Sequence, residues 1–246
     1  MRKPTTLIAG KFGSRHFGTR PYLAHAVERT GVANPVALYI GAASGDDATF
    51  GAALGALLTA AGAGRVLWPK LSGRRKQAAQ MREALVEADL VFVGGGDVEA
   101  GMQALRDADL VAVIHAAADR GAVFAGMSAG AIMLGKRWIR WPSAESGDDE
   151  AETYECLGVV PLALDTHGEG DDWREAQSYA SVRARELGTS VRAYGVPSGG
   201  ALVIDPAGRI EAHGVPAAVF AAMRSEEHTS ELQSLAYLVC RLLLEK

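Results

Sequence analysis

The feature that most constrains the fold is a repeated alternation of short apolar runs with longer segments of helical periodicity. Several runs are continuous stretches of Val, Leu, Ile and Phe, such as Leu90–Val93. Such strands are typically buried on both faces, and their alternation with helices is typical of βαβ units. We therefore predict an α/β fold of three layers, in which helices cover both faces of a mainly parallel sheet. The expected strands are Thr6–Ala9, Val36–Ile40, Arg65–Trp68, Leu90–Val93 and Val123–Ala125, and the expected helices are Pro21–Arg29, Thr49–Ala61, Arg74–Glu87, Ala100–Arg106 and Asp109–Arg120.

The pattern changes after residue 128. A short helix is expected at Ala129–Leu134, followed by a strand-like KRWIRW and by an acidic loop, SAESGDDEAE, without periodicity. Extended segments follow near Val159–Asp165 and Ala201–Ile204, and residues 209–212 complete a hairpin across the turn Asp205-Pro206-Ala207-Gly208. Because no linker or internal repeat interrupts the chain, residues 1–223 are predicted to form a single domain.

Residues 224–246 are predicted not to belong to the native protein. The segment begins RSEEHTSELQS, which resembles a translated sequencing-adapter oligonucleotide, so Cys240 and His228 receive no functional role. The alternative is a genuine amphipathic helix in the closing LAYLVCRLLLEK.

The composition excludes several functional classes. The 246 residues are 48% hydrophobic and 22% charged, with a formal net charge of -4, which gives no basis for a nucleic-acid partner. The amino-terminal segment lacks the apolar core of a signal peptide, and no stretch approaches the ~20 apolar residues that span a bilayer. Two cysteines, neither in a CxxC pair, fit a reducing compartment. We expect a cytoplasmic protein with no membrane partner and no cofactor.

The strongest local motif is the run Gly126-Met127-Ser128-Ala129-Gly130, which follows an apolar strand and precedes a helix. This is the G-x-S-x-G pattern in the strand-to-helix context that gives it meaning. Such a turn exposes the serine hydroxyl, and the N–H of Ala129 at the helix start can stabilise an oxyanion. The alternative is an ordinary glycine-rich turn.

A second glycine turn follows the strand Leu90–Val93. In GGGD (94–97) the backbone N–H groups of Gly95 or Gly96 can supply a second oxyanion donor. A plain tight turn is the alternative, and the run does not have the G-x-G-x-x-G spacing of a dinucleotide site.

His167 is the predicted base. It follows an apolar run and enters the loop GEGDDW, as expected for a base at a strand end. The other histidines before residue 224 are His16, His25, His115 and His213. The run from His167 to Asp172 can in principle hold a divalent cation, but no H-E-x-x-H or second histidine cluster supports it, so we expect no metal.

Four motifs together resemble the dipeptidase E and cyanophycinase family of serine peptidases. They are GGGD (94–97), GMSAGA (126–131), LGVVPLALDTH (157–167) and YGVPSGGALVI (194–204), spread over residues 5–213. The resemblance implies a flavodoxin-like fold similar to class I glutamine amidotransferase domains. It also implies a Ser128 nucleophile, a His167 base and an oxyanion hole from the glycine turn and Ala129. Small peptides, among them Asp-containing dipeptides, are the implied substrates.

Some positions depart from the family pattern. Asp97, assigned to substrate binding, is followed by Val98 where relatives commonly have Gln. The triad acid of the family lies between the serine and the histidine, and Glu145 is the candidate by spacing, with Asp148 and Asp149 close by. Arg174 resembles a basic residue of relatives and can pair with a substrate carboxylate, or form a surface salt bridge instead.

Two other functions remain open from the sequence. An α/β-hydrolase esterase would use a late base, for which His213 is the candidate. A binding protein without activity is possible because the fold alone does not define a function. Fold relatives often dimerise, so a homodimer is a further expectation.

Overall fold

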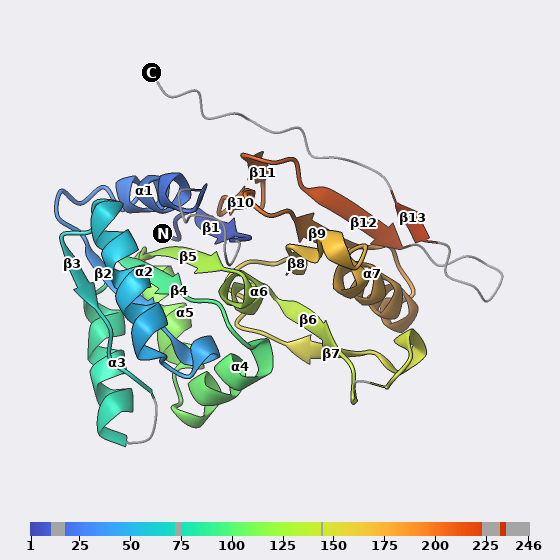
Figure 1. The fold of residues 1–246 in the computed structure, drawn as a ribbon, viewed down its shortest axis with the longest axis horizontal. Coiled ribbons are helices and arrows are strands. Elements are labelled where there is room, and N and C mark those ends of the chain that lie inside the picture. The colour runs from blue at the N-terminus through green and yellow to red at the C-terminus, as the bar shows by residue number, and fades with distance from the viewer. Residues whose placement is uncertain (11–17, 72–74, 144, 223–231, 235–246) are drawn as a thin grey trace.

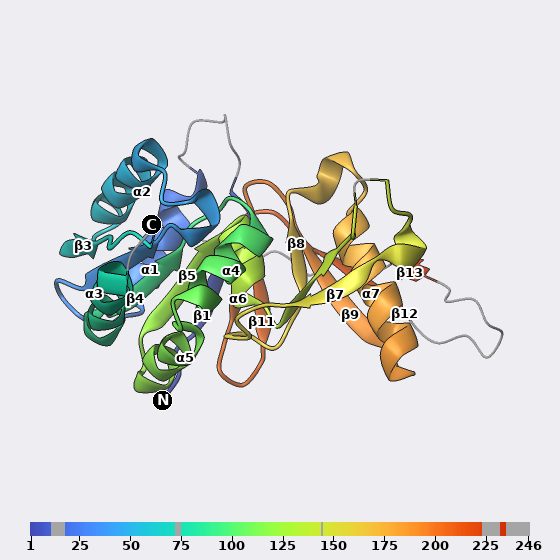
Figure 2. The same cartoon turned by 90° about the horizontal axis from the view of Figure 1, so that it is seen from below.

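The computed structural model describes residues 1–10, 18–71, 75–143, 145–222 and 232–234. Figure 1 shows a large helix-covered sheet beside a smaller part built from β8, β9, β12 and α7. Figure 2 shows the same two parts side by side from below. His16, Arg74 and most of the predicted non-native segment lie outside the described residues.

The larger sheet has seven strands in the order β11-β10-β1-β5-β4-β2-β3. Neighbouring strands from β1 to β3 in this order are parallel, whereas β10 and β11 are antiparallel to their neighbours. Their bounds are β1 (Thr5–Ile8), β2 (Val36–Ile40), β3 (Arg65–Leu67), β4 (Leu90–Val93), β5 (Val123–Met127), β10 (Ala201–Ile204) and β11 (Ile210–His213). The predicted hairpin across residues 205–208 is confirmed by the pairing of β10 with β11.

Alternate residues of each central strand contribute to two separate hydrophobic cores. In β4, Val91 and Val93 pack into one core, and Leu90 and Phe92 pack into the other. The first core is covered by α3 (Arg75–Glu87), α4 (Val98–Asp107), α5 (Val111–Arg120) and α6 (Ala129–Leu134), and the second by α1 (Arg20–Glu28) and α2 (Ala48–Ala60). The predicted three-layer α/β fold is therefore confirmed, because a strand buried on both faces needs helices on both sides.

The predicted elements of this sheet agree with the structure apart from their ends. The clearest difference is α4, which begins at Val98 rather than at Ala100, because the Asp97 carboxylate caps it and accepts the N–H of Ala100 at 2.7 Å. Strand β5 continues to Met127 and so reaches the residue before Ser128.

The smaller part contains a four-stranded sheet in the order β13-β12-β9-β8 and the hairpin of β6 with β7. Its elements are β6 (Arg137–Arg140), β7 (Glu152–Glu155), β8 (Leu164–Thr166), α7 (Arg174–Leu187), β9 (Val191–Val196), β12 (Ala218–Ala222) and β13 (Leu232–Ser234). Ile139, Tyr179, Ala180 and Phe220 lie in its own hydrophobic core. The sequence analysis did not anticipate α7, β9 or β12. The strand expected at Val159–Asp165 is shorter and later, and β7 begins at the last residue of the expected acidic loop.

Strand β13 belongs to the segment predicted not to be native and pairs antiparallel with β12. The division of the chain at residue 223 stays a prediction. Within the described residues, no helix is both long and apolar enough to cross a bilayer.

Candidate active site

Ser128 lies at the corner between β5 and α6, where its backbone has φ 53° and ψ −127°. A positive φ is costly for serine, and such strain is commonly found at functional corners. The flanking glycines are required by packing. A Cβ on Gly126 would lie 2.5 Å from the Gly130 carbonyl oxygen, and a Cβ on Gly130 would lie 2.1 Å from the Val93 carbonyl oxygen. The two glycines of the motif therefore permit the sharp turn that exposes Ser128.

His167 reaches Ser128 from the smaller sheet. It follows β8 in the left-handed conformation, with φ 48°, and its N–H donates to the Val196 carbonyl of β9 at 2.9 Å. The His167 Nε2 atom lies 2.8 Å from Ser128 Oγ. This distance is that of a hydrogen bond between a nucleophile and its base. The structure thus brings together the two residues predicted as nucleophile and base.

The glycine turn after β4 lies against Ser128. A Cβ on Gly95 would be 3.0 Å from Ser128 Cβ and 3.6 Å from Ser128 Oγ. The N–H groups of Gly94 and Asp97 are hydrogen-bonded to Ile40 and Ala43, whereas those of Gly95 and Gly96 donate to no acceptor in the described part of the chain.

The backbone of Gly96 explains why this turn needs glycine. Its φ is 143°, and a Cβ there would lie 2.0 Å from the Ala43 carbonyl oxygen. Directly after the nucleophile, the Ala129 N–H occupies the first position of α6, which has no partner within its helix. The glycine turn and the start of α6 therefore both offer N–H donors close to Ser128, and the predicted oxyanion hole stays a prediction.

A cavity of about 1200 Å³ opens in front of this pair. Ser128, His167, Gly95, Gly96 and Met127 line it, together with residues of α2 and of the loop after β8. The volume is more than enough for a small peptide.

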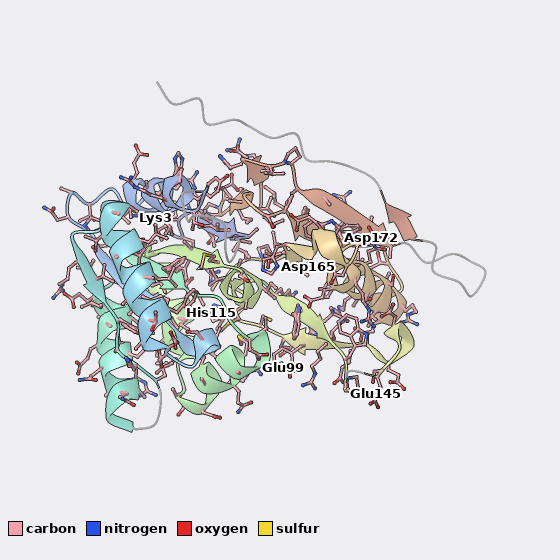
Figure 3. All side chains as sticks on the ribbon, viewed as in Figure 1. Lys3, Glu99, His115, Glu145, Asp165 and Asp172 are labelled. Atoms are coloured by element: carbon pink, nitrogen blue, oxygen red, sulfur yellow. The ribbon has the colours of Figure 1, made fainter. Side chains whose placement is uncertain are left out.

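Three predicted site residues do not meet Ser128. Glu145 is exposed and lies at the outer end of the smaller part, far from Asp165 in Figure 3. Arg174 forms a salt bridge with Asp148 at 2.7 Å and lies over the Trp141 ring at 4.4 Å. Asp97 is exposed and caps α4. None of the three lines the cavity as far as the structure describes it.

Glu169 is a cavity residue that the sequence analysis missed. It follows His167 by two positions, and its Oε1 accepts the Ser198 N–H at 2.6 Å. Burial alone would raise the pKa of Glu169, but backbone hydrogen bonds and the nearby His167 ring together lower it. Glu169 therefore places an ionised carboxylate in the cavity with Ser128 and His167. Its position within GEG, directly after the predicted base, was the available signal.

A second missed carboxylate, Asp165, lies in β8 two positions before His167 and is buried, with an exposed fraction of 4%. Burial, and then the charge of Glu175, raise the pKa of Asp165 to about 8. Glu175 accepts a hydrogen bond from the Trp138 indole N–H at 2.5 Å, whereas Asp165 Oδ2 has no hydrogen-bond partner among the described residues. Asp165 is thus expected to be uncharged at neutral pH.

His213 occupies a different region. It is buried at the end of β11 and pairs with Ala201, which pairs with Ile8, which pairs with Met127. Three strand spacings of about 4.8 Å each separate His213 from the strand that carries the serine. The described residues contain no group of three or more His, Cys, Asp or Glu arranged to hold a metal ion.

The strand-to-helix corner and the serine–histidine pair define an α/β protein of the nucleophile-elbow class. The sequence model of Peptidase family S51 matches residues 11–209, and the chain belongs to this family. The family resemblance seen in the motifs is thereby confirmed.

Individual relatives agree with this assignment. Peptidase E of Citrobacter koseri is 32% identical over 88 residues, which are 34% of this chain and 36% of that protein, so the chain matches only about a third of this relative's length. The crystal structure of a peptidase from an acI-B1 Actinobacterium has a TM-score of 0.66 and 16% identity, and the match covers 95% of both chains. The structural match supports the fold.

Proposed function

We propose that this chain is a serine peptidase that hydrolyses small peptides through an acyl-enzyme. The observation that carries the proposal is the 2.8 Å separation of Ser128 Oγ and His167 Nε2 at the edge of a peptide-sized cavity. Membership of Peptidase family S51 supports the same reaction class.

In the proposed mechanism, His167 Nε2 takes the hydroxyl proton as Ser128 Oγ attacks the carbonyl carbon of the scissile bond. The N–H groups of Ala129 and of Gly95 or Gly96 stabilise the oxyanion. The protonated His167 then delivers its proton to the leaving amine. Water, deprotonated by the same ring, attacks the acyl ester and releases the acid and free Ser128.

Glu169 takes the electrostatic role that the sequence analysis gave to Glu145. Its carboxylate lines the cavity with His167, and their charges interact favourably. A negative charge in this position stabilises the imidazolium that forms after proton transfer. Glu145 is exposed at the outer end of the smaller part, where it would act on His167 only after a large movement.

The proposal is tested with the purified full chain, a panel of dipeptides and a fluorophosphonate probe. Ser128→Ala is expected to abolish labelling and to lower kcat/KM by at least ~10³-fold. His167→Ala is expected to lower kcat/KM by ~10²–10⁴-fold. His213→Ala, with folding checked by circular dichroism, is the control and should retain activity.

The controls separate this proposal from its rivals. Loss of activity only in His213→Ala would refute the role of His167 and favour an esterase-type arrangement. A folded wild-type protein that neither labels nor hydrolyses any peptide would refute the peptidase and favour a binding protein.

A further inference from the structure

Trp173 ends the loop that follows His167, and its backbone conformation is unusual for a tryptophan. It has φ 61° and ψ 38°, in the left-handed region that bulky side chains rarely adopt. His167 and Asp172 also have positive φ values, 48° and 55°, so the loop is strained at both of its ends. Such strain persists only where surrounding contacts fix the backbone. The loop therefore needs contacts beyond its own backbone to keep His167 in place.

The indole ring of Trp173 lies against two glycines, one in the loop and one in β9. A Cβ on Gly168 would lie 3.0 Å from Trp173 Cε3, and a Cβ on Gly195 would lie 2.5 Å from the same atom. Both glycines are buried. Glycine inside a strand often marks the close approach of another group. Because neither glycine has a side chain, the indole ring can lie directly on both backbones.

These two glycines flank the hydrogen bond that holds the predicted base. Gly168 directly follows His167 in the sequence, and Gly195 directly precedes the next residue of β9, Val196. The His167 N–H donates to the Val196 carbonyl at 2.9 Å. The Trp173 N–H in turn donates to the Gly168 carbonyl at 2.8 Å. Trp173 thus contacts the chain next to both partners of this hydrogen bond.

The ring itself is anchored in the core of the smaller part. Trp173 is half-buried and packs with Phe220 of β12, with the ring centroids 6.3 Å apart. Gly195 lies in β9, an inner strand that pairs with β8 on one side and β12 on the other. Trp173 does not line the cavity in front of Ser128 as far as the structure describes it. It can therefore act on the base without contacting a substrate.

We propose that Trp173 is a positioning residue that holds His167 in the left-handed conformation in which its Nε2 reaches Ser128 Oγ. This inference rests on the proposed peptidase function. Without the indole ring, the strained loop can relax, and the imidazole leaves the 2.8 Å separation from Ser128 Oγ. A displacement of about 1 Å in a reacting group can lower a rate by ~10²-fold. Substitution of Trp173 is therefore expected to lower kcat and to leave KM nearly unchanged.

The first measurement gives kcat and KM of the full-length variants for the dipeptide that the wild-type enzyme cleaves best. Trp173→Leu is expected to lower kcat by ~10- to 100-fold and to change KM by less than ~3-fold. Trp173→Phe keeps a flat ring above the two glycines and is expected to restore kcat to within ~5-fold of the wild-type value.

Trp141→Leu is the matched control. Trp141 packs against the same hydrophobic core as Trp173, but its ring lies under the Arg174 guanidinium at 4.4 Å. This substitution also removes an indole from the smaller part and lowers stability. It is expected to keep kcat within ~3-fold of the wild-type value, because it leaves the two glycines and the indole ring of Trp173 in contact.

The second measurement does not depend on activity. Hydrogen exchange of the His167 N–H, followed by NMR, reports how often its bond to the Val196 carbonyl opens. In Trp173→Leu the exchange rate of this N–H is expected to rise by ~10-fold or more over the wild-type rate. The N–H groups of β4, in the larger sheet, are expected to keep their wild-type rates and serve as the internal control.

The outcomes distinguish this inference from the proposed function. A folded Trp173→Leu variant with wild-type kcat, a change confined to KM, or an equal loss of kcat in Trp141→Leu would overturn the positioning role and leave the peptidase intact. Unchanged exchange of the His167 N–H would overturn it as well. A wild-type protein that hydrolyses no peptide would refute the proposed function, and the exchange rates alone would then decide whether Trp173 holds the loop.

A second variant keeps the test decisive if Trp173→Leu does not fold. Gly195→Ala adds a Cβ 2.5 Å from Trp173 Cε3 and therefore displaces the indole ring while keeping it in the chain. The same fall in kcat and the same rise in His167 N–H exchange are expected. Wild-type values of both in Gly195→Ala would overturn the inference.

Discussion

Replacing Asp165 by asparagine is expected to stabilise the protein at alkaline pH and to change little near pH 4. Asp165 is 4% exposed, its Oδ2 has no hydrogen-bond partner among the described residues, and its pKa is raised from 3.8 to about 8. Between these pH values the folded chain holds a proton that the unfolded chain has released. The free energy of unfolding of the wild type therefore falls as pH rises through this window. At ~1.4 kcal/mol per pH unit, the loss of unfolding free energy approaches ~6 kcal/mol above pH 8.

The assay is urea unfolding at pH 4.5 and pH 8.5, followed by tryptophan fluorescence. Asparagine keeps the size of the side chain and one oxygen acceptor but does not ionise, so Asp165→Asn should be the more stable protein only at pH 8.5. Asp172→Asn replaces an exposed carboxylate near the same loop and should change the free energy of unfolding by less than ~0.5 kcal/mol. A difference between Asp165→Asn and wild type that is the same at both pH values would refute the reasoning.

Three further substitutions test the corner and the salt bridge. Gly130→Ala should lower the free energy of unfolding by ~1–3 kcal/mol, measured by heat or urea, because the added Cβ would lie 2.1 Å from the Val93 carbonyl oxygen. An unchanged melting temperature would contradict this contact. Ser128→Gly should raise the free energy of unfolding by ~1 kcal/mol while abolishing activity, since glycine tolerates φ 53°, and a destabilised variant would argue against strain. Arg174→Ala should change kcat/KM by less than ~3-fold and stability by ~1 kcal/mol at most, because its exposed pair with Asp148 lies away from the cavity; a large rise in KM would restore its substrate role.

Local pattern was sufficient to predict the large sheet. The run Leu90–Val93 is apolar at every position, and only a strand covered on both faces buries such a run, as β4 does. The G-x-S-x-G motif was equally informative, because a sharp strand-to-helix corner needs glycine on both sides of Ser128. His167 could be nominated from its place after an apolar run, although the run itself is shorter as a strand than expected.

The rest of the candidate site and the smaller part of the fold depend on contacts between segments that are distant in sequence. Spacing along the chain does not encode such contacts. Glu145 was selected by its distance in sequence from Ser128, yet the intervening β6 carries the chain to the far end of the smaller part. Arg174 pairs with a residue 26 positions earlier. Helix α7 was missed because much of its buried face consists of alanines, including Ala176, Ala180 and Ala184, which give a weak periodic signal.

Strand β8, after which His167 follows directly, has β9 as its only strand neighbour among the residues that the structure describes. During synthesis on a ribosome, Ser128 and its corner emerge well before residues 191–196, which form β9. Until β9 has left the exit tunnel, β8 has no partner strand and the His167 N–H has no Val196 carbonyl to bind. A nascent chain is therefore expected to carry an exposed serine without a correctly held base. Hydrolytic competence would be acquired only after most of the polypeptide has been made.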